Sequence, residues 1–179
     1  MSYGSNDQKP LNENNYFQAG INQNVTINAE FRSPKKDGTG DKILCIDITG
    51  SKGEKFTVTE WPAKDGEDDK VKNQLTRLRR WVKEVTGEDN FPVMFTSFED
   101  MATQFCTFVN GKGTLLEFKL LYGTKYLEMP KYDNCVRSMS NSVRLTLSTS
   151  ESAKLKKPEV AATPVDDMDA VASSSDLDF

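Results

Sequence analysis

Apolar and polar residues follow a β-type pattern over three runs in the first third of the chain. Between Asn24 and Arg32 every second residue is apolar, as in a strand with one buried face. Residues 43–49 are β-branched and apolar, residues 55–61 alternate again, and the Gly-Ser-Lys-Gly sequence between them predicts a hairpin. Pro62 ends the third strand, because proline has no N–H to donate to a neighbouring strand.

A helical periodicity follows over residues 69–86 and again over residues 98–109. In the first helix, Asp68 or Asp69 is the predicted N-cap and Gly87 the predicted end. In the second, a capping-box sequence starts at Ser97. We expect each helix to bury one apolar face. The apolar stripe of the first helix consists of Val71, Leu75, Leu78, Val82 and Val85.

Strand patterns return in the last third of the chain. Residues 114–122 alternate, Gly123-Thr124 predicts a two-residue hairpin turn, and residues 125–129 return as far as Pro130. A final strand is predicted over residues 142–147. This order predicts a mainly β, OB-fold-like five-stranded barrel with one or two helices between strands three and four, since closure removes sheet edges. An α+β sheet with both helices on one face is the alternative.

Composition divides the 179 residues into three parts. Residues 1–20 are rich in Asn and Gln and are predicted to be a flexible polar segment. Residues 21–150 are expected to form the barrel domain. Residues 151–179 are predicted to be a disordered acidic tail, because their composition lacks periodicity and buries little apolar surface.

The formal charge of −4 conceals an acidic tail on a mildly basic body. Residues 158–179 contain six acids and no base, whereas residues 1–157 contain 23 bases and 21 acids. The last four residues, Asp176, Leu177, Asp178 and Phe179, combine carboxylates with an aromatic ring, which suits insertion into a basic-rimmed pocket of a partner protein. A tail that only increases solubility would explain the same composition.

Missing residue types exclude several kinds of chemistry. Histidine is absent, so Ser-His-Asp and Cys-His nucleophiles and most zinc sites cannot form. Three widely spaced cysteines are expected to be reduced in a cytoplasmic protein. The sequence contains no apolar run of the ~20 residues that a membrane helix needs, no signal peptide and no P-loop. We therefore expect no membrane insertion, metal, cofactor or enzymatic activity. The strand acids Asp47, Glu60, Glu117 and Glu128 are expected to face solvent.

Aromatic residues interleaved with bases indicate binding of single-stranded nucleic acid. Strand alternation should turn Trp61 and Tyr126 outward, and Tyr132 follows in a loop. Exposed rings stack on unpaired bases while cations contact phosphates, and no sequence is read. In the first helix, Arg77 and Trp81 are four residues apart, so the guanidinium can lie over the indole. The predicted nucleic-acid-binding residues are Arg32, Lys35, Lys36, Trp61, Arg77, Trp81, Lys119, Lys125, Tyr126, Lys131, Tyr132 and Arg137.

The same residues also fit other arrangements. The bases between Lys70 and Lys83 also suit a solvated helix face, and single tyrosines also suit barrel packing. Strand parity places Lys119 on the outer face of its strand and Lys125 on the inner side of the next. The groove could therefore be built from the late strands, or from Lys35-Lys36 and the first helix.

Taken together, the chain resembles the single-stranded DNA-binding proteins of bacteria and especially of their phages. The resemblance rests on the barrel-like body with aromatic and basic residues, the acidic linker and the ending Asp176-Leu177-Asp178-Phe179. The commonest bacterial ending has Pro before the final Phe, where this chain has Asp178. The resemblance implies a body that coats DNA strands without strong sequence preference in replication, recombination or repair. It further implies a tail that recruits replication or recombination proteins and competes with DNA, in a cytoplasmic protein that can form a homo-oligomer.

A function of another class competes with this expectation. Small β domains with polar tails also decorate capsids and join assemblies, and a fold alone does not settle function. The alternative is a phage structural or protein-interaction module that binds no nucleic acid.

Overall fold

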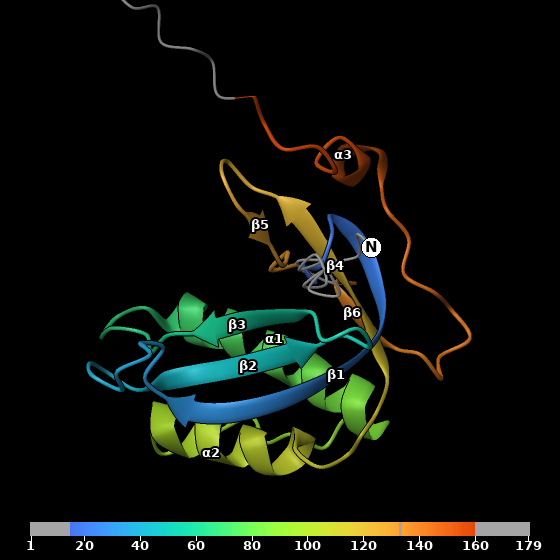
Figure 1. Ribbon diagram of the computed structural model, residues 1–179. Helices are drawn as coiled ribbons and strands as arrows, with labels where there is room; N and C mark the ends of the chain where they lie inside the picture. Colours follow the sequence, from blue (N-terminus) through green and yellow to red (C-terminus); the bar gives the residue numbers. More distant parts are fainter. Residues whose placement is uncertain (1–14, 133, 160–179) are drawn as a thin grey trace, which may run out of the picture.

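Antiparallel strands form the framework of the protein (Figure 1). This computed structural model describes residues 15–132 and 134–159. The strands are hydrogen-bonded in the order β3-β2-β1-β4-β5, and β6 also pairs with β4. Their bounds are β1 Gly20–Arg32, β2 Ile43–Thr49, β3 Lys55–Glu60, β4 Leu116–Tyr122, β5 Leu127–Glu128 and β6 Val136–Ser138.

The long strand β1 curls the sheet, because its two halves pair with different neighbours (Figure 1). Its first half, from Gly20 to Val25, pairs with β4, and its second half pairs with β2. The register of pairing between β1 and β4 shifts between Asn22 and Val25. At this point Asn24 has a φ of 58°, a left-handed conformation that asparagine tolerates better than most residues. Among the described residues no ladder joins β3 to β5, so the sheet is a curled half-barrel.

Two helices connect the third and fourth strands, as predicted. Helix α1 spans Asp68–Thr86 and ends at Gly87, which adopts the left-handed conformation expected of a C-cap. Helix α2 spans Phe98–Val109, and the Ser97 hydroxyl accepts the Asp100 N–H at its start, as the capping sequence indicates. The N-cap of α1 is Glu67, without a side-chain cap, rather than Asp68 or Asp69. The mainly β architecture with this helical connection is therefore confirmed.

The buried face of α1 differs from the predicted stripe. Val71 at its start is exposed, whereas Gln74 and Trp81 are buried with the later apolar residues. The difference arises because the Gln74 amide donates to Glu60 and to the carbonyl of Trp61, which gives this polar side chain buried partners. Because of these tertiary contacts, the buried face of the helix includes Gln74 and Trp81 and does not include Val71, so it differs from the apolar stripe of the sequence.

The core lies between the inner face of the sheet and the two helices. Phe118 of β4 packs edge-on against Phe17, with ring centroids 5.1 Å apart, and also contacts Phe56 of β3. Phe17 is buried, as is Glu151 beyond the last strand. The folded body therefore extends on both sides beyond the predicted domain of residues 21–150.

A segment that follows β6 crosses the outer face of β4, and we call residues 142–155 the crossing segment. Residues 142–147 do not form the predicted strand, and the last strand is instead β6. The Leu145 N–H donates to the Glu117 carboxylate over 2.6 Å, so this part of the backbone contacts a β4 side chain rather than a strand ladder. Helix α3, Thr149–Ser152, continues the crossing segment.

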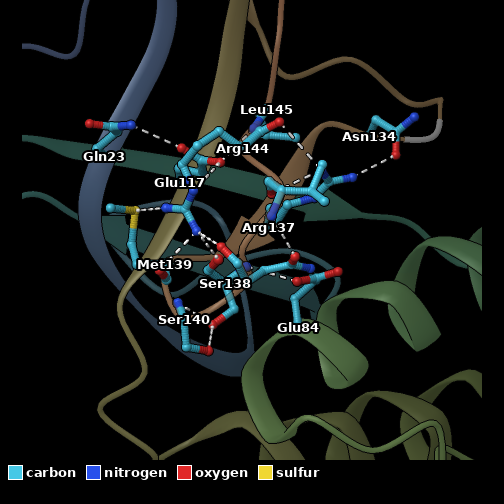
Figure 2. A network of polar contacts seen from close by, with 12 residues as sticks. Gln23, Glu84, Glu117, Asn134, Arg137, Ser138, Met139, Ser140, Arg144 and Leu145 are labelled. Carbon is cyan, nitrogen blue, oxygen red and sulfur yellow. Dashed lines mark hydrogen bonds and ion pairs between the residues drawn. The ribbon is translucent and has the colours of Figure 1, made fainter.

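Glu117 is fully buried beneath the crossing segment, in the network of Figure 2. Its carboxylate accepts hydrogen bonds from Gln23 over 3.0 Å and from the Leu145 N–H, and lies 3.9 Å from Arg144 Nε. Glu117 was expected to face solvent because it lies on the polar side of its strand. The crossing segment covers that side of the strand. The alternation of apolar and polar residues within the strand cannot predict this contact, because the covering residues are distant in sequence.

The β4–β5 connection also differs from its prediction. Tyr122 pairs with Leu127, and the Gly123 N–H donates to the Tyr126 carbonyl, so the turn is centred on Thr124 and Lys125 rather than on Gly123 and Thr124. Lys125 lies in this turn and is exposed, because strand parity does not extend into a loop.

We predict that Glu117→Ala lowers the free energy of unfolding by about 2–4 kcal/mol, since it leaves the buried Leu145 N–H without an acceptor and removes the hydrogen bond from Gln23. Urea denaturation monitored by tryptophan fluorescence measures the change. The exposed Glu99 is the control, and Glu99→Ala should cost less than about 1 kcal/mol. Equal effects of the two substitutions would contradict a structural role for the buried carboxylate.

Candidate functional site

An open groove of about 650 Å³ lies between β3 and the β4–β5 hairpin. It occurs on the side where the half-barrel leaves β3 and β5 unpaired. Rings and aliphatic side chains form most of its lining, and two lysines also line it. The residues used below are Phe56, Trp61, Tyr122, Lys131, Tyr132 and Lys154.

The groove presents two exposed aromatic rings from separate elements. Trp61 follows directly after β3 and is 50% exposed, as strand parity predicted. Tyr132 is 51% exposed and lies between β5 and β6, where Pro130 is followed by a stretch without strand pairing. The two rings therefore stand in one groove although 71 positions separate them in the chain.

The phenol of Tyr132 is fixed by a buried ion pair. Its hydroxyl donates to Glu151 Oε1 over 2.6 Å, and the Lys119 ammonium contacts both oxygens of the same carboxylate at 3.0 and 3.1 Å. Lys119 and Glu151 are only 4% and 6% exposed. The Ser148 N–H donates to the second oxygen over 2.7 Å, so the carboxylate has partners on both sides.

This environment changes the pKa of both acidic groups. Burial alone would raise the pKa of Glu151, but hydrogen bonds from Tyr132, the Ser148 N–H and Lys119, with the lysine charge, lower it to about 2. Burial, and then the hydrogen bond to the negatively charged Glu151, raise the pKa of Tyr132 to about 12. The phenol therefore stays protonated, and the carboxylate charged, over the physiological pH range.

Unpaired lysines lie beside the rings. Within residues 15–132 and 134–159, Lys131 and Lys154 form no ion pair, and both line the groove. At the hairpin tip the Lys125 ammonium lies 5.4 Å from the centroid of the exposed Tyr126 ring. Glu128 also lines the groove, so its lining is not uniformly basic.

Two predicted binding arginines are already paired with acids. Arg32 forms a bidentate hydrogen bond with Asp47 at 2.9 and 3.0 Å. Arg77 contacts both oxygens of the buried Glu60 at 2.8 Å, and this hydrogen-bonded pair raises the pKa of Arg77. The Arg77 guanidinium therefore pairs with Glu60, where the sequence suggested stacking on Trp81. Asp47 and Glu60 serve as partners of arginines, and the expectation that Glu60 faces solvent is wrong.

Two further predicted residues lie inside the body. Trp81 is 4% exposed, because this face of α1 packs into the apolar core. Lys119 is buried because the crossing segment covers the outer face of β4 and supplies Glu151 as its partner. The expected surface positions of Trp81 and Lys119 are therefore wrong, since both the helix face and the outer strand face are covered.

The remaining predicted residues lie at separate places. Lys35 and Lys36 are exposed in the loop between β1 and β2. Arg137 of β6 donates to the carbonyls of Val143 and Arg144 at the crossing segment. The predicted partner-binding residues lie outside the described residues. They are Asp176, Leu177, Asp178 and Phe179.

Sequence reasoning missed Lys154, which lines the groove from the crossing segment. The signal available was the basic run Lys154-Leu155-Lys156-Lys157 directly before the acidic residues. Phe56 and Tyr122 also line the groove, although neither is among the predicted binding residues.

Comparisons with known proteins identify no relative. A scan against protein-family models and searches of curated proteins and of solved structures find no match. None of the helices in the described ranges has the length and hydropathy needed to cross a membrane. The part of the chain that the structure describes also contains no group of three or more Cys, Asp or Glu able to bind a metal ion.

The depressed pKa of Glu151 predicts a loss of stability in acid. Because this carboxyl titrates near 4.5 when unfolded and near 2 when folded, its contribution is complete above about pH 4.5 and disappears as pH falls towards 2. In thermal melting experiments, the Glu151→Gln protein should have a lower melting temperature than the unsubstituted protein at pH 7. Its melting temperature should also fall less as the pH is lowered from 4.5 towards 2. Glu99→Gln should retain the pH dependence of the unsubstituted protein, and an unchanged slope in Glu151→Gln would contradict the assignment.

Proposed function

We propose that this protein binds single-stranded DNA in the groove between β3 and the β4–β5 hairpin, without strong sequence preference. One observation carries the proposal: Trp61 and Tyr132 expose their rings in an open groove that is also lined by Lys131 and Lys154, both without an ion pair within the described residues. Rings that can stack and cations without acid partners are what an unpaired polyanion requires.

The chemistry of these groups favours single strands over duplexes. A base contributes roughly 1–3 kcal/mol when it stacks on an aromatic ring, and only an unpaired base offers its face. The lysines meet phosphates as point charges, release counterions and make the affinity dependent on salt. Neither interaction distinguishes one base sequence from another, which accounts for the proposed lack of specificity.

The half-barrel supports an OB-fold as the architecture. Three meandering strands, a helical connection and a second hairpin follow one another, and β1 pairs with both β2 and β4. OB-folds bind oligonucleotides on a strand face beside the loops between strands one and two and between strands four and five. Here the first of these loops contains Lys35 and Lys36, and the second contains Lys125 and Tyr126.

The biological role that follows is coating of DNA strands during replication, recombination or repair. The acidic residues 158–179 then serve as a contact for replication or recombination proteins through Asp176, Leu177, Asp178 and Phe179. Tethering six acids close to the lysines also gives them a high effective concentration as competitors of DNA. Lys154, which lines the groove, lies four residues before the acidic stretch of residues 158–179.

The proposal is tested by titrating fluorescent oligo-dT and a duplex of equal length at two salt concentrations. We expect tighter binding of the single strand, weakened by salt. Absence of binding to either nucleic acid at low salt would favour the alternative, a protein-interaction or phage structural module. Repeating the titration without residues 158–179 separates a weak groove from one that the acidic residues occupy.

We predict that Trp61→Ala weakens binding of oligo-dT by about 1–3 kcal/mol, roughly five- to 150-fold, because one stacking ring is lost. Thermal stability should change little, since half of the side chain is already exposed. Tyr16 is an exposed aromatic residue that does not line the groove, so Tyr16→Ala is the matched control. If the two variants bound oligo-dT with equal affinity, the DNA would have to bind outside the groove.

Charge reversal of the groove lysines tests the electrostatic part. We predict that Lys131→Glu with Lys154→Glu weakens binding and lowers the slope of log affinity against log salt by roughly 1.4, about 0.7 for each phosphate contact. The control, Lys72→Glu with Lys83→Glu on α1, changes the net charge equally. A larger loss in the control would show that the helix, rather than the groove, contacts DNA.

A further inference from the structure

The segment that completes the groove comes from outside the barrel strands. Lys154 lines the groove, and its carbonyl accepts the N–H of Tyr122, the last residue of β4, over 2.9 Å. Glu151, three residues earlier, is the buried partner of Lys119 and accepts the phenol of Tyr132. Docking of the crossing segment thus positions both a groove cation and a groove ring.

The Tyr132 ring stands in the groove with its far end fixed. The ring is about half exposed, and its hydroxyl donates to the carboxylate of Glu151 over 2.6 Å. That carboxylate cannot rotate freely, since Lys119, the Ser148 N–H and the capping box of α3 all contact it or its backbone. The orientation of the ring is therefore determined before any ligand arrives.

We propose that Glu151, docked by Lys119, is a positioning residue that holds the Tyr132 ring ready to stack on an unpaired base. This inference rests on the proposed function and adds to it that the crossing segment sets the affinity of the groove. Fixing a side chain during binding opposes association, and a ring fixed in advance avoids that loss. The Tyr132 hydroxyl then contributes to affinity through Glu151 rather than through the DNA.

Because the Lys119–Glu151 ion pair is buried, the hydrogen-bond acceptor of Tyr132 can be removed by replacing both partners together. An ion pair within a protein can often be replaced by apolar residues of similar volume without loss of stability, whereas removing one partner alone is costly. Lys119→Met with Glu151→Leu should therefore remove the acceptor of Tyr132 at a smaller loss of stability than Glu151→Leu alone, although the Ser148 N–H also loses its acceptor. Glu151→Asp is a second background, in which the charge stays near Lys119 but the acceptor is one methylene shorter.

The test is a double-mutant cycle on affinity for oligo-dT. In the unsubstituted protein we expect Tyr132→Phe to weaken binding about two- to tenfold although the ring remains. In the Lys119→Met, Glu151→Leu background, or in Glu151→Asp if that variant does not fold, Tyr132→Phe should cause no further loss. Equal losses in both backgrounds would mean that the hydroxyl contacts DNA directly, and no loss in either would overturn the proposal.

An alkaline titration of tyrosine absorbance tests the Tyr132–Glu151 hydrogen bond directly, because it reports the pKa of the phenol rather than the stability of the fold. The signal missing from Tyr132→Phe should titrate near 12 in the unsubstituted protein. Replacing Glu151 by leucine should lower this pKa, because the hydrogen bond and the negative charge are lost, while burial of the phenol continues to raise it. An unchanged titration would show that Glu151 does not fix the phenol. If the unsubstituted protein fails to bind oligo-dT, the proposed function fails, whereas binding that is indifferent to Tyr132→Phe removes only this inference.

Discussion

The buried ion pair between Lys119 and Glu151 is the interaction on which the rest of the candidate site depends. Burying two charges is unfavourable unless each finds close partners, and here Glu151 accepts from Lys119, Tyr132 and the Ser148 N–H. The pair requires the crossing segment to lie over β4. That path brings Lys154 to the groove and holds Tyr132, so one contact across 32 residues of sequence organises one side of the site.

A second buried carboxylate supports the same path. Glu117 lies two residues before Lys119 on the same face of β4 and accepts the Leu145 N–H. Both side chains would point to solvent in an isolated sheet, and the crossing segment supplies what each needs. The polar face of β4 thereby becomes an interior layer built from charges and hydrogen bonds, while the apolar face with Phe118 joins the core.

Pairing among charges also separates structural bases from those available to a ligand. Arg32, Arg77 and Lys119 each contact a carboxylate and stabilise the body. Lys131 and Lys154 form no ion pair within the described residues and lie at the groove. A count of bases along the chain therefore overstates the positive surface, and the groove's electrostatics depend on a few side chains near the exposed rings.

The sequence alone determined the strands β1 to β4, both long helices and the exposure of Trp61, Tyr126 and Tyr132. Those features follow from local periodicity, caps and breakers such as Gly87, which act between residues close in the chain. Tertiary structure alone decided that Trp81 and Lys119 are buried, that residues 142–147 cross β4 instead of pairing as a strand, and that Lys154 joins the groove. The physical reason is that each of these depends on partners distant in sequence: an alternating strand shows which side is polar, but not whether another segment will cover that side and neutralise its charges.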